Sequence, residues 1–118
     1  HKYHCFLVMV TMETAPDSMM YIENIEQALE YMVEAIRHKI RRIDVCTRYS
    51  AMQYLIILFE SDESQIPKVM DRIFIQYYKL YDKRDFIPKY EYLPVNEHSE
   101  ETNPQNTSDH LNQDIHPV

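Results

Sequence analysis

The chain has 118 residues, and not one of them is glycine. At the usual frequency of about 7%, a chain of this length holds about eight glycines. Loops that cradle a nucleotide phosphate need glycine, because the backbone must come close to the ligand and often takes a positive φ angle. The composition therefore excludes Walker-type loops and Rossmann dinucleotide fingerprints. It also requires every tight turn to be built from residues that carry a side chain.

Hydrophobic periodicity divides the first part of the chain into six expected elements. Apolar residues recur at helical spacing over residues 23–42 and 66–82. We expect strands at residues 3–12, 44–49, 53–60 and 86–95. The strand at 53–60 is apolar on both faces, which favours a central place, whereas Pro88 and Pro94 favour an edge for the last strand. The order β-α-β-β-α-β predicts a ferredoxin-like α+β fold, an antiparallel sheet with two helices on one face.

Charge and composition separate residues 1–95 from residues 96–118. The net charge is −7, yet all 12 basic residues and only 14 of the 19 acidic ones precede residue 96. The polar, acidic end of the chain holds too few large aliphatic side chains to bury a core. We therefore expect one domain over residues 1–95 and a tail, either a disordered linker or a docked extension, over residues 96–118. An acidic chain also lacks the basic face that nucleic-acid binding needs.

Several signals are absent from the sequence. No apolar run approaches the roughly 20 residues of a membrane-spanning helix, so we expect no direct insertion into a membrane. Cys5 and Cys46 stand alone inside expected strands, which indicates reduced, packed thiols and favours the cytoplasm. The histidines are scattered without metal-ligand spacing, and we expect no metal site. Because the first residue is His1 and not methionine, we expect a piece of a longer protein.

The most informative stretch runs from Arg41 to Leu58. It indicates the end of a basic helix, a short strand, a tight turn and a second, apolar strand. An Arg-x-x-Asp motif, Arg41 to Asp44, ends the helix, and the five residues Val45 to Tyr49 separate it from the turn. This arrangement resembles the signature hairpin of GGDEF domains, the diguanylate cyclase family, whose palm is elaborated from the same ferredoxin-like core. The five signature positions fall here on Ser50, Ala51, Met52, Gln53 and Tyr54.

The resemblance implies the fold of a cyclase without its chemistry. In active family members, an aspartate that closes the first strand and the glutamate of the signature hold Mg²⁺ ions on the nucleotide phosphates. Those positions are Thr11 and Gln53 here, and neither side chain carries the negative charge that magnesium requires. The two signature glycines, which let guanine nucleotide approach, are Ser50 and Ala51, and Met52 replaces the signature aspartate. We therefore expect a catalytically inactive GGDEF-like regulatory domain of a bacterial signalling protein, with no catalytic residue, no cofactor and no metal.

The Arg-x-x-Asp motif has a separate implication. In many GGDEF proteins this motif binds the product, cyclic di-GMP, with the arginine on phosphate and guanine and the aspartate on the guanine edge. The resemblance thus implies a cyclic di-GMP site at Arg41 and Asp44, helped by Arg42, and we expect both motif side chains to point outward. Arg37 and Lys39 add positive potential nearby. The same residues also fit an ordinary helix end, where the dipole favours basic side chains and Arg-x-x-Asp forms a surface ion pair.

Two other functions stay open. The first is a nucleotide-independent protein-interaction or dimerisation module, whose partner is a second copy or another domain of a longer signalling chain. An exposed edge strand supplies a surface for such pairing. The second is an altered nucleotide hydrolase, which needs a new metal site. Only Glu13, Asp17 and Glu26 lie in the right region of the sequence for that site.

Overall fold

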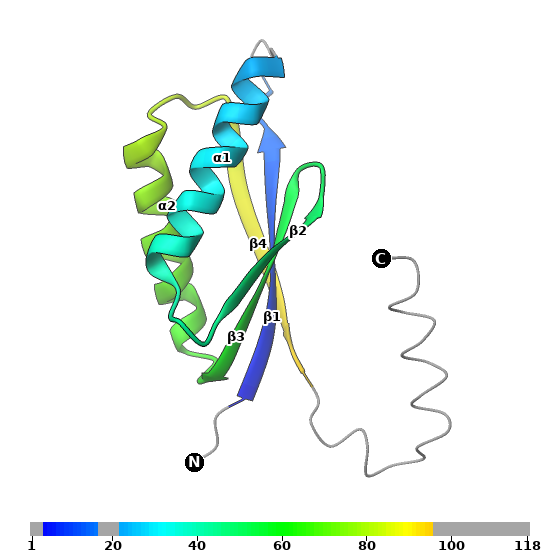
Figure 1. Cartoon of the computed structure of the whole chain (residues 1–118), viewed down its shortest axis with the longest axis vertical. Coiled ribbons are helices and arrows are strands. Elements are labelled where there is room, and N and C mark those ends of the chain that lie inside the picture. Colours follow the sequence, from blue (N-terminus) through cyan, green and yellow to red (C-terminus); the bar gives the residue numbers. More distant parts are fainter. Residues whose placement is uncertain (1–3, 17–21, 96–118) are drawn as a thin grey trace, which may run out of the picture.

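The computed structural model describes residues 4–16 and 22–95, and the tail expected at 96–118 lies outside the described residues. The described residues form strands and helices in the order β-α-β-β-α-β (Figure 1). The elements are β1 (His4–Thr14), α1 (Ile22–Lys39), β2 (Val45–Ser50), β3 (Gln53–Ser61), α2 (Gln65–Leu80) and β4 (Phe86–Pro94). Neither helix combines the length and apolar character that crossing a membrane requires.

The strands form one antiparallel sheet in the order β2-β3-β1-β4. Both helices lie on the same face of this sheet and pack against each other (Figure 1). This is the ferredoxin-like arrangement that the sequence predicted. β3 lies inside the sheet, as its two apolar faces indicated, and β4 with Pro88 and Pro94 lies at one edge.

The hydrophobic core lies between the sheet and the two helices. Alternate residues of β1 and β3 are buried, because successive side chains of a strand point to opposite faces of the sheet. The helices add an apolar stripe each. The largest fully buried side chains are Tyr77, Phe86, Met32, Ile36, Ile56, Ile66, Met70, Ile73, Val8 and Val10. Within the described residues no helix covers the other face of the sheet.

The ends of α1 and β1 differ from the sequence expectation, and α2 ends at Leu80 and not at residue 82. α1 ends at Lys39 and not at residue 42. The backbone N–H of Arg41 donates to the Asp44 carboxylate at 2.9 Å, and the N–H of Asp44 donates to the carbonyl of Arg41 at 3.0 Å. These bonds close a turn in place of the last helical turn. β1 runs two residues further than expected, to Thr14, because its end pairs with the beginning of β4.

The missing glycines have a visible consequence at Glu60. Its φ angle is 47°, in the left-handed region that glycine occupies more easily. No other described residue has a positive φ angle. Glu60 lies where the pairing of β1 with β3 shifts between His4 and Phe6, so a β-bulge carries the strained residue.

Candidate functional site

An ion pair between Arg41 and Asp44 holds the corner between α1 and β2. The guanidinium donates from Nε to Oδ2 and from Nη2 to Oδ1 of Asp44, each over 3.0 Å. Two parallel bonds of this kind fix direction as well as distance. The side chain of Asp44 is 2% exposed, whereas that of Arg41 is 49% exposed. The expectation that both side chains point outward is therefore wrong for Asp44.

Asp44 has no acceptor position left for a ligand. Its Oδ2 also accepts the backbone N–H of Arg41 at 2.9 Å, and its Oδ1 accepts the backbone N–H of Phe59 at 3.1 Å. Each carboxylate oxygen thus accepts two hydrogen bonds, which fills its usual capacity. In this geometry Asp44 ties the α1–β2 corner to β3 and orients the guanidinium of Arg41.

Arg41 keeps donors free for an anion. Its Nη2 donates to the backbone carbonyl of Phe59 and, over 3.0 Å, to Oγ of Ser61. Its Nη1 donates to no atom of the described residues. Since half of the side chain is exposed, two N–H groups of a fixed guanidinium remain available.

Arg41 lines a cavity of about 210 Å³ between the end of α1 and the beginning of α2. Four lining side chains are cationic, namely Lys39, Arg41, Lys68 and Arg72. The acidic lining residue, Asp44, is already paired with Arg41. Lys39, Lys68 and Arg72 form no ion pair within residues 4–16 and 22–95. The positive end of the α2 dipole and the negative end of the α1 dipole both lie here, so the positive charge of the cavity comes from these side chains. The remaining lining residues are Leu58, Ser61, Gln65 and Val69. The cavity is therefore suited to an anion.

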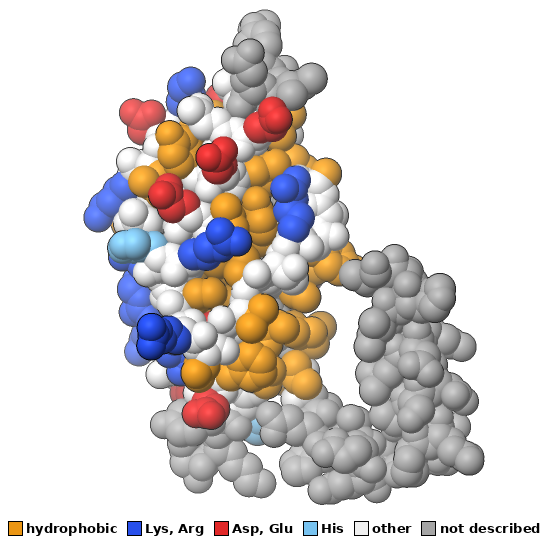
Figure 2. Space-filling view, in the orientation of Figure 1, with side chains coloured by type: hydrophobic (Ala, Val, Ile, Leu, Met, Phe, Trp, Pro, Cys, Tyr) orange, Lys and Arg blue, Asp and Glu red, His pale blue; other side chains and the backbone are white. Residues whose placement is uncertain are grey.

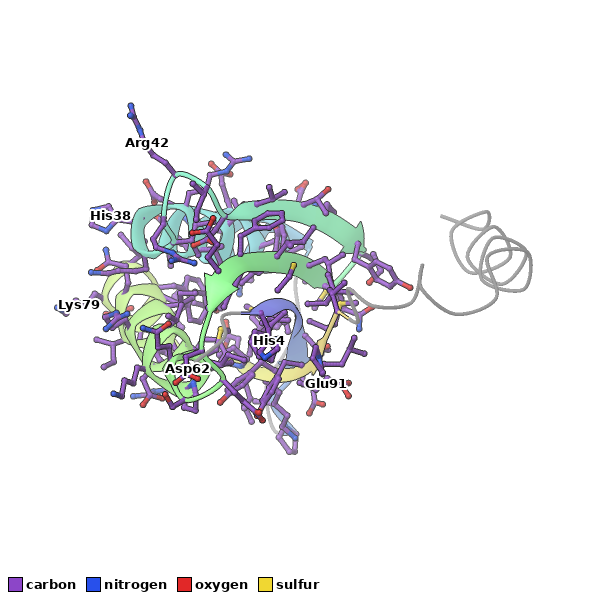
Figure 3. All side chains as sticks on the ribbon, turned by 90° about the horizontal axis from the view of Figure 1, so that it is seen from below. His4, His38, Arg42, Asp62, Lys79 and Glu91 are labelled. Atoms are coloured by element: carbon purple, nitrogen blue, oxygen red, sulfur yellow. The ribbon has the colours of Figure 1, made fainter. Side chains whose placement is uncertain are left out.

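The sequence did not single out Lys68 and Arg72. They lie one helical turn apart, so their spacing puts both on one face of α2, but the sequence alone does not say which element that face meets. Arg42, by contrast, is exposed, points away from the ribbon (Figure 3) and does not line the cavity. Arg37 lies elsewhere on α1. Burial raises the pKa of the Cys46 thiol, and the charge of Arg37 opposes that rise.

The β2–β3 hairpin lies beside the first strand as the resemblance requires. Thr11 of β1 is the register partner of Gln53 in β3. Nε2 of Gln53 donates to Oγ1 of Thr11 at 3.1 Å, and Oγ of Ser50 donates to Oε1 of Gln53 at 2.7 Å. Thr11 and Gln53, the two positions where the resemblance places Mg²⁺ ligands in active GGDEF domains, are thus in contact, and both side chains are neutral.

Arg48, which the sequence did not single out for a role here, covers the carbonyl groups of this hairpin. It donates from Nε to the carbonyl of Ser50 and from Nη2 to that of Ala51, each over 2.8 Å. Its guanidinium lies 5.6 Å from the ring centroid of Tyr54, a buried residue whose hydroxyl donates to a backbone carbonyl of α1 at 3.0 Å. Met52 packs against the core. The side chains of residues 50–54 therefore serve the turn and the core.

The acids named for an altered hydrolase do not gather. Oε1 of Glu13 lies 2.9 Å from Nζ of Lys89 in an exposed ion pair. Glu26 is exposed on α1, and Asp17 lies outside the described residues. Within residues 4–16 and 22–95, no three His, Cys, Asp or Glu side chains come close enough together to hold a metal ion. The geometry gives the hydrolase interpretation no support.

Comparison with known proteins gives matches in structure alone. No protein-family model and no curated protein matches the sequence. A DGC protein from Thermotoga maritima is 14% identical, with 91% of this chain and 77% of that chain aligned and a TM-score of 0.62. The diguanylate cyclase SiaD from Pseudomonas aeruginosa, solved in complex with its activator SiaC, is 13% identical, with 95% of this chain and 46% of that chain aligned and a TM-score of 0.64. The chain thus spans less than half of SiaD. At these identities the likeness shows the fold, and that fold is the one found in diguanylate cyclases.

Proposed function

We propose that this chain, whose fold is that of a GGDEF domain, is a catalytically inactive regulatory module of a bacterial signalling protein in the cytoplasm. The neutral contact between Thr11 and Gln53 supports the loss of activity. Mg²⁺ is a hard cation that needs anionic oxygen ligands, and phosphoryl transfer needs the metal to neutralise developing charge. The Thr11 hydroxyl and the Gln53 amide are hydrogen-bonded to each other and carry no negative charge, so they do not supply anionic ligands for Mg²⁺.

The hairpin offers a second obstacle to nucleotide chemistry. Ser50 and Ala51 carry side chains where the family has glycine, and Arg48 already occupies the turn carbonyls. Incubation of the purified protein with GTP and Mg²⁺ tests the inactivity directly. We expect no cyclic di-GMP above a blank without protein, and synthesis of the dinucleotide would overturn this half of the proposal.

The second half of the proposal concerns a ligand. We propose that the cavity beside Arg41 binds the phosphates of cyclic di-GMP, and the observation that carries this is its lining by Lys39, Arg41, Lys68 and Arg72 with one, already paired acid. Guanidinium groups match phosphate oxygens in pairs, whereas lysines act as point charges. In this account Asp44 acts by positioning Arg41, and Arg42 adds positive potential from outside the cavity.

Calorimetric titration with cyclic di-GMP tests the ligand. Arg72→Ala and Lys68→Ala remove exposed cavity cations without disturbing a described hydrogen bond, and we expect each to weaken binding by roughly tenfold or more. Arg37→Ala is the matched control, since it removes a charge of the same kind from outside the cavity. No heat in the unmodified protein defeats the proposal. Equal affinity in all three variants and the unmodified protein defeats the assignment to this cavity.

A second candidate function is a protein-interaction or dimerisation module that binds no nucleotide. The observation that favours it is the helix-free face of the sheet, where Leu7, Met9, Leu55 and Ile57 are only partly covered. Figure 2 shows hydrophobic side chains gathered over the strands. Exposed apolar patches of this kind mark contact surfaces. The candidate partner for this face is either another domain of a longer signalling chain or a second copy of this chain.

A further inference from the structure

The two edges of the sheet differ in how they are protected. β4 forms one edge and contains Pro88 and Pro94, which cannot donate to another strand. β2 forms the other edge and has neither proline nor lysine in its six residues. One side of an edge strand presents unpaired N–H and C=O groups. Among residues 4–16 and 22–95, no strand pairs with the outer side of β2, so β2 is the edge open to a further strand.

Exposed apolar side chains gather on the same edge. Ile43, Val45 and Tyr49 are 50%, 43% and 46% exposed. Arg48 is the charged residue of β2, and its guanidinium is turned back onto the hairpin carbonyls of its own chain. The edge therefore carries apolar side chains without a free charge to repel a partner strand.

We propose that β2 pairs antiparallel with β2 of a second copy, about a two-fold axis that passes by Thr47. This register places Val45 opposite Tyr49 of the second copy, and the reverse pair follows by symmetry. Thr47 lies opposite Thr47 of the second copy. Aromatic–β-branched and Thr–Thr pairs are among the favourable cross-strand pairs. The proposal does not rest on cyclic di-GMP binding, and it names the surface of the dimerisation alternative.

Neighbouring registers are less favourable. A two-fold axis at Arg48 leaves the apolar Val45 opposite Ala51, which lies beyond the strand in the hairpin turn. A shift of the axis to Cys46 leaves Tyr49 opposite Ile43, which precedes the strand. A slip by one residue sets side chains of the helix-covered face against those of the open face. A centre at Thr47 pairs Val45 to Tyr49 with the same residues of the second copy and leaves only Ser50 opposite a residue outside the strand.

Pairing at this edge joins two four-stranded sheets into one continuous sheet. Val45 already lies in register with Ile57, and Leu7 pairs with Ile57 from the other side. The apolar side chains of Leu7, Ile57 and Val45 in one copy are therefore continuous, across the two-fold axis, with those of the second copy. An interface of one strand pair and its exposed side chains is small, so we expect a reversible dimer at protein concentrations of tens to hundreds of micromolar.

Sedimentation of the full chain over a concentration series tests the proposal. Val45→Lys puts a charge on the open edge at an exposed position, and we expect it to weaken the dimer by about tenfold or more. Leu93→Lys is the matched control, since Leu93 is exposed on the other edge strand, and we expect no change. A monomer up to roughly 500 µM contradicts the proposal, since weak contacts of this size still associate there. A dimer that Val45→Lys leaves intact, or that Leu93→Lys also abolishes, contradicts it too.

A disulfide test reads the register. Thr47→Cys, in a background with Cys5→Ala and Cys46→Ala, places two thiols directly opposite each other across the two-fold axis. Facing Cβ atoms in antiparallel pairs are about 4.5–5.5 Å apart, close to what a disulfide needs. We expect a covalent dimer on mild oxidation, and none for the control Glu91→Cys, an exposed position in the middle of β4. Equal cross-linking of the two variants, or none for Thr47→Cys, contradicts the register.

Discussion

The carboxylate of Asp44 is buried and receives two hydrogen bonds from the guanidinium of Arg41, whose own side chain is half exposed. The pair therefore has one structural member and one accessible member. Asp44 holds the backbone at the α1–β2 corner, and Arg41 faces a cavity lined by three further cations. Of the motif's two residues, only Arg41 keeps donors free toward the cavity.

Replacing Asp44 tests its structural role. We expect Asp44→Ala to lower the free energy of unfolding by about 2–4 kcal/mol, because the N–H groups of Arg41 and Phe59 lose their acceptor. Arg42→Ala, an exposed neighbour, is the control and changes stability by less than about 0.5 kcal/mol. Denaturant unfolding of both variants measures the two free energies of unfolding. Equal unfolding midpoints would contradict the structural role of Asp44.

Restoring carboxylates at the hairpin tests the account of lost metal binding. In the double variant Thr11→Asp with Gln53→Glu, two negative charges face each other in register, which costs about 0.5–1 kcal/mol without a cation. We expect a lowered melting temperature that Mg²⁺ partly restores, and no response to Mg²⁺ in the unmodified protein. Thermal melts with and without Mg²⁺ decide this. A Mg²⁺-dependent rise in the unmodified protein contradicts the account.

Tyr77 offers a stability prediction inside the core. Its hydroxyl is buried and has no hydrogen-bond partner among the described residues. A buried polar group without a partner costs about 1–3 kcal/mol, so we expect Tyr77→Phe to be neutral or to stabilise the fold by about 1 kcal/mol. Tyr81→Phe is the contrast, since that hydroxyl donates to Asp85 at 2.8 Å, and its loss is expected to destabilise. Destabilisation by both changes would show that the Tyr77 hydroxyl is satisfied.

The same tyrosine, Tyr81, predicts a pH dependence. Burial, followed by the hydrogen bond to Asp85, raises the pKa of Tyr81 from 10 to about 12. The folded state thus holds this proton more tightly than the unfolded state does. Its contribution to stability is complete below about pH 10 and is lost as the pH rises towards 12. Unfolding measured at about pH 9 and about pH 12 should therefore show a smaller drop in stability for Tyr81→Phe than for the unmodified protein. An equal loss of stability in Tyr81→Phe and in the unmodified protein contradicts this contribution of Tyr81.

The fold was predictable because each helix carries an apolar stripe at helical spacing and the expected strands are short apolar runs. Residues 53–58 point alternately to the core and to the open face of the sheet. The apolar stripe of each helix indicated which side of that helix packs on the sheet. The end of α1 was placed too late because the sequence does not show that the Asp44 side chain would capture the N–H of Arg41. That capture depends on Phe59, a residue brought there by the sheet.

The candidate site was predictable only in part. Arg41 and Lys39 were predictable, since both stand at the basic end of the helix expected over residues 23–42. Lys68 and Arg72 come from a helix that follows two strands later, and only the packing of α1 on α2 brings them to the same cavity. Arg42 was included by adjacency in the chain, but it lies in the turn after α1 and its side chain points away from the ribbon (Figure 3).

Chemical-shift mapping of the intact protein with cyclic di-GMP tests the central claim most directly, because it distinguishes the cationic cavity from the β2–β3 hairpin. The account predicts saturable shifts at the backbone amides of Arg41, Ser61, Lys68 and Arg72, with Thr11 and Gln53 unmoved. Shifts centred on Thr11 and Gln53, or a spectrum that the dinucleotide leaves unchanged, would contradict it.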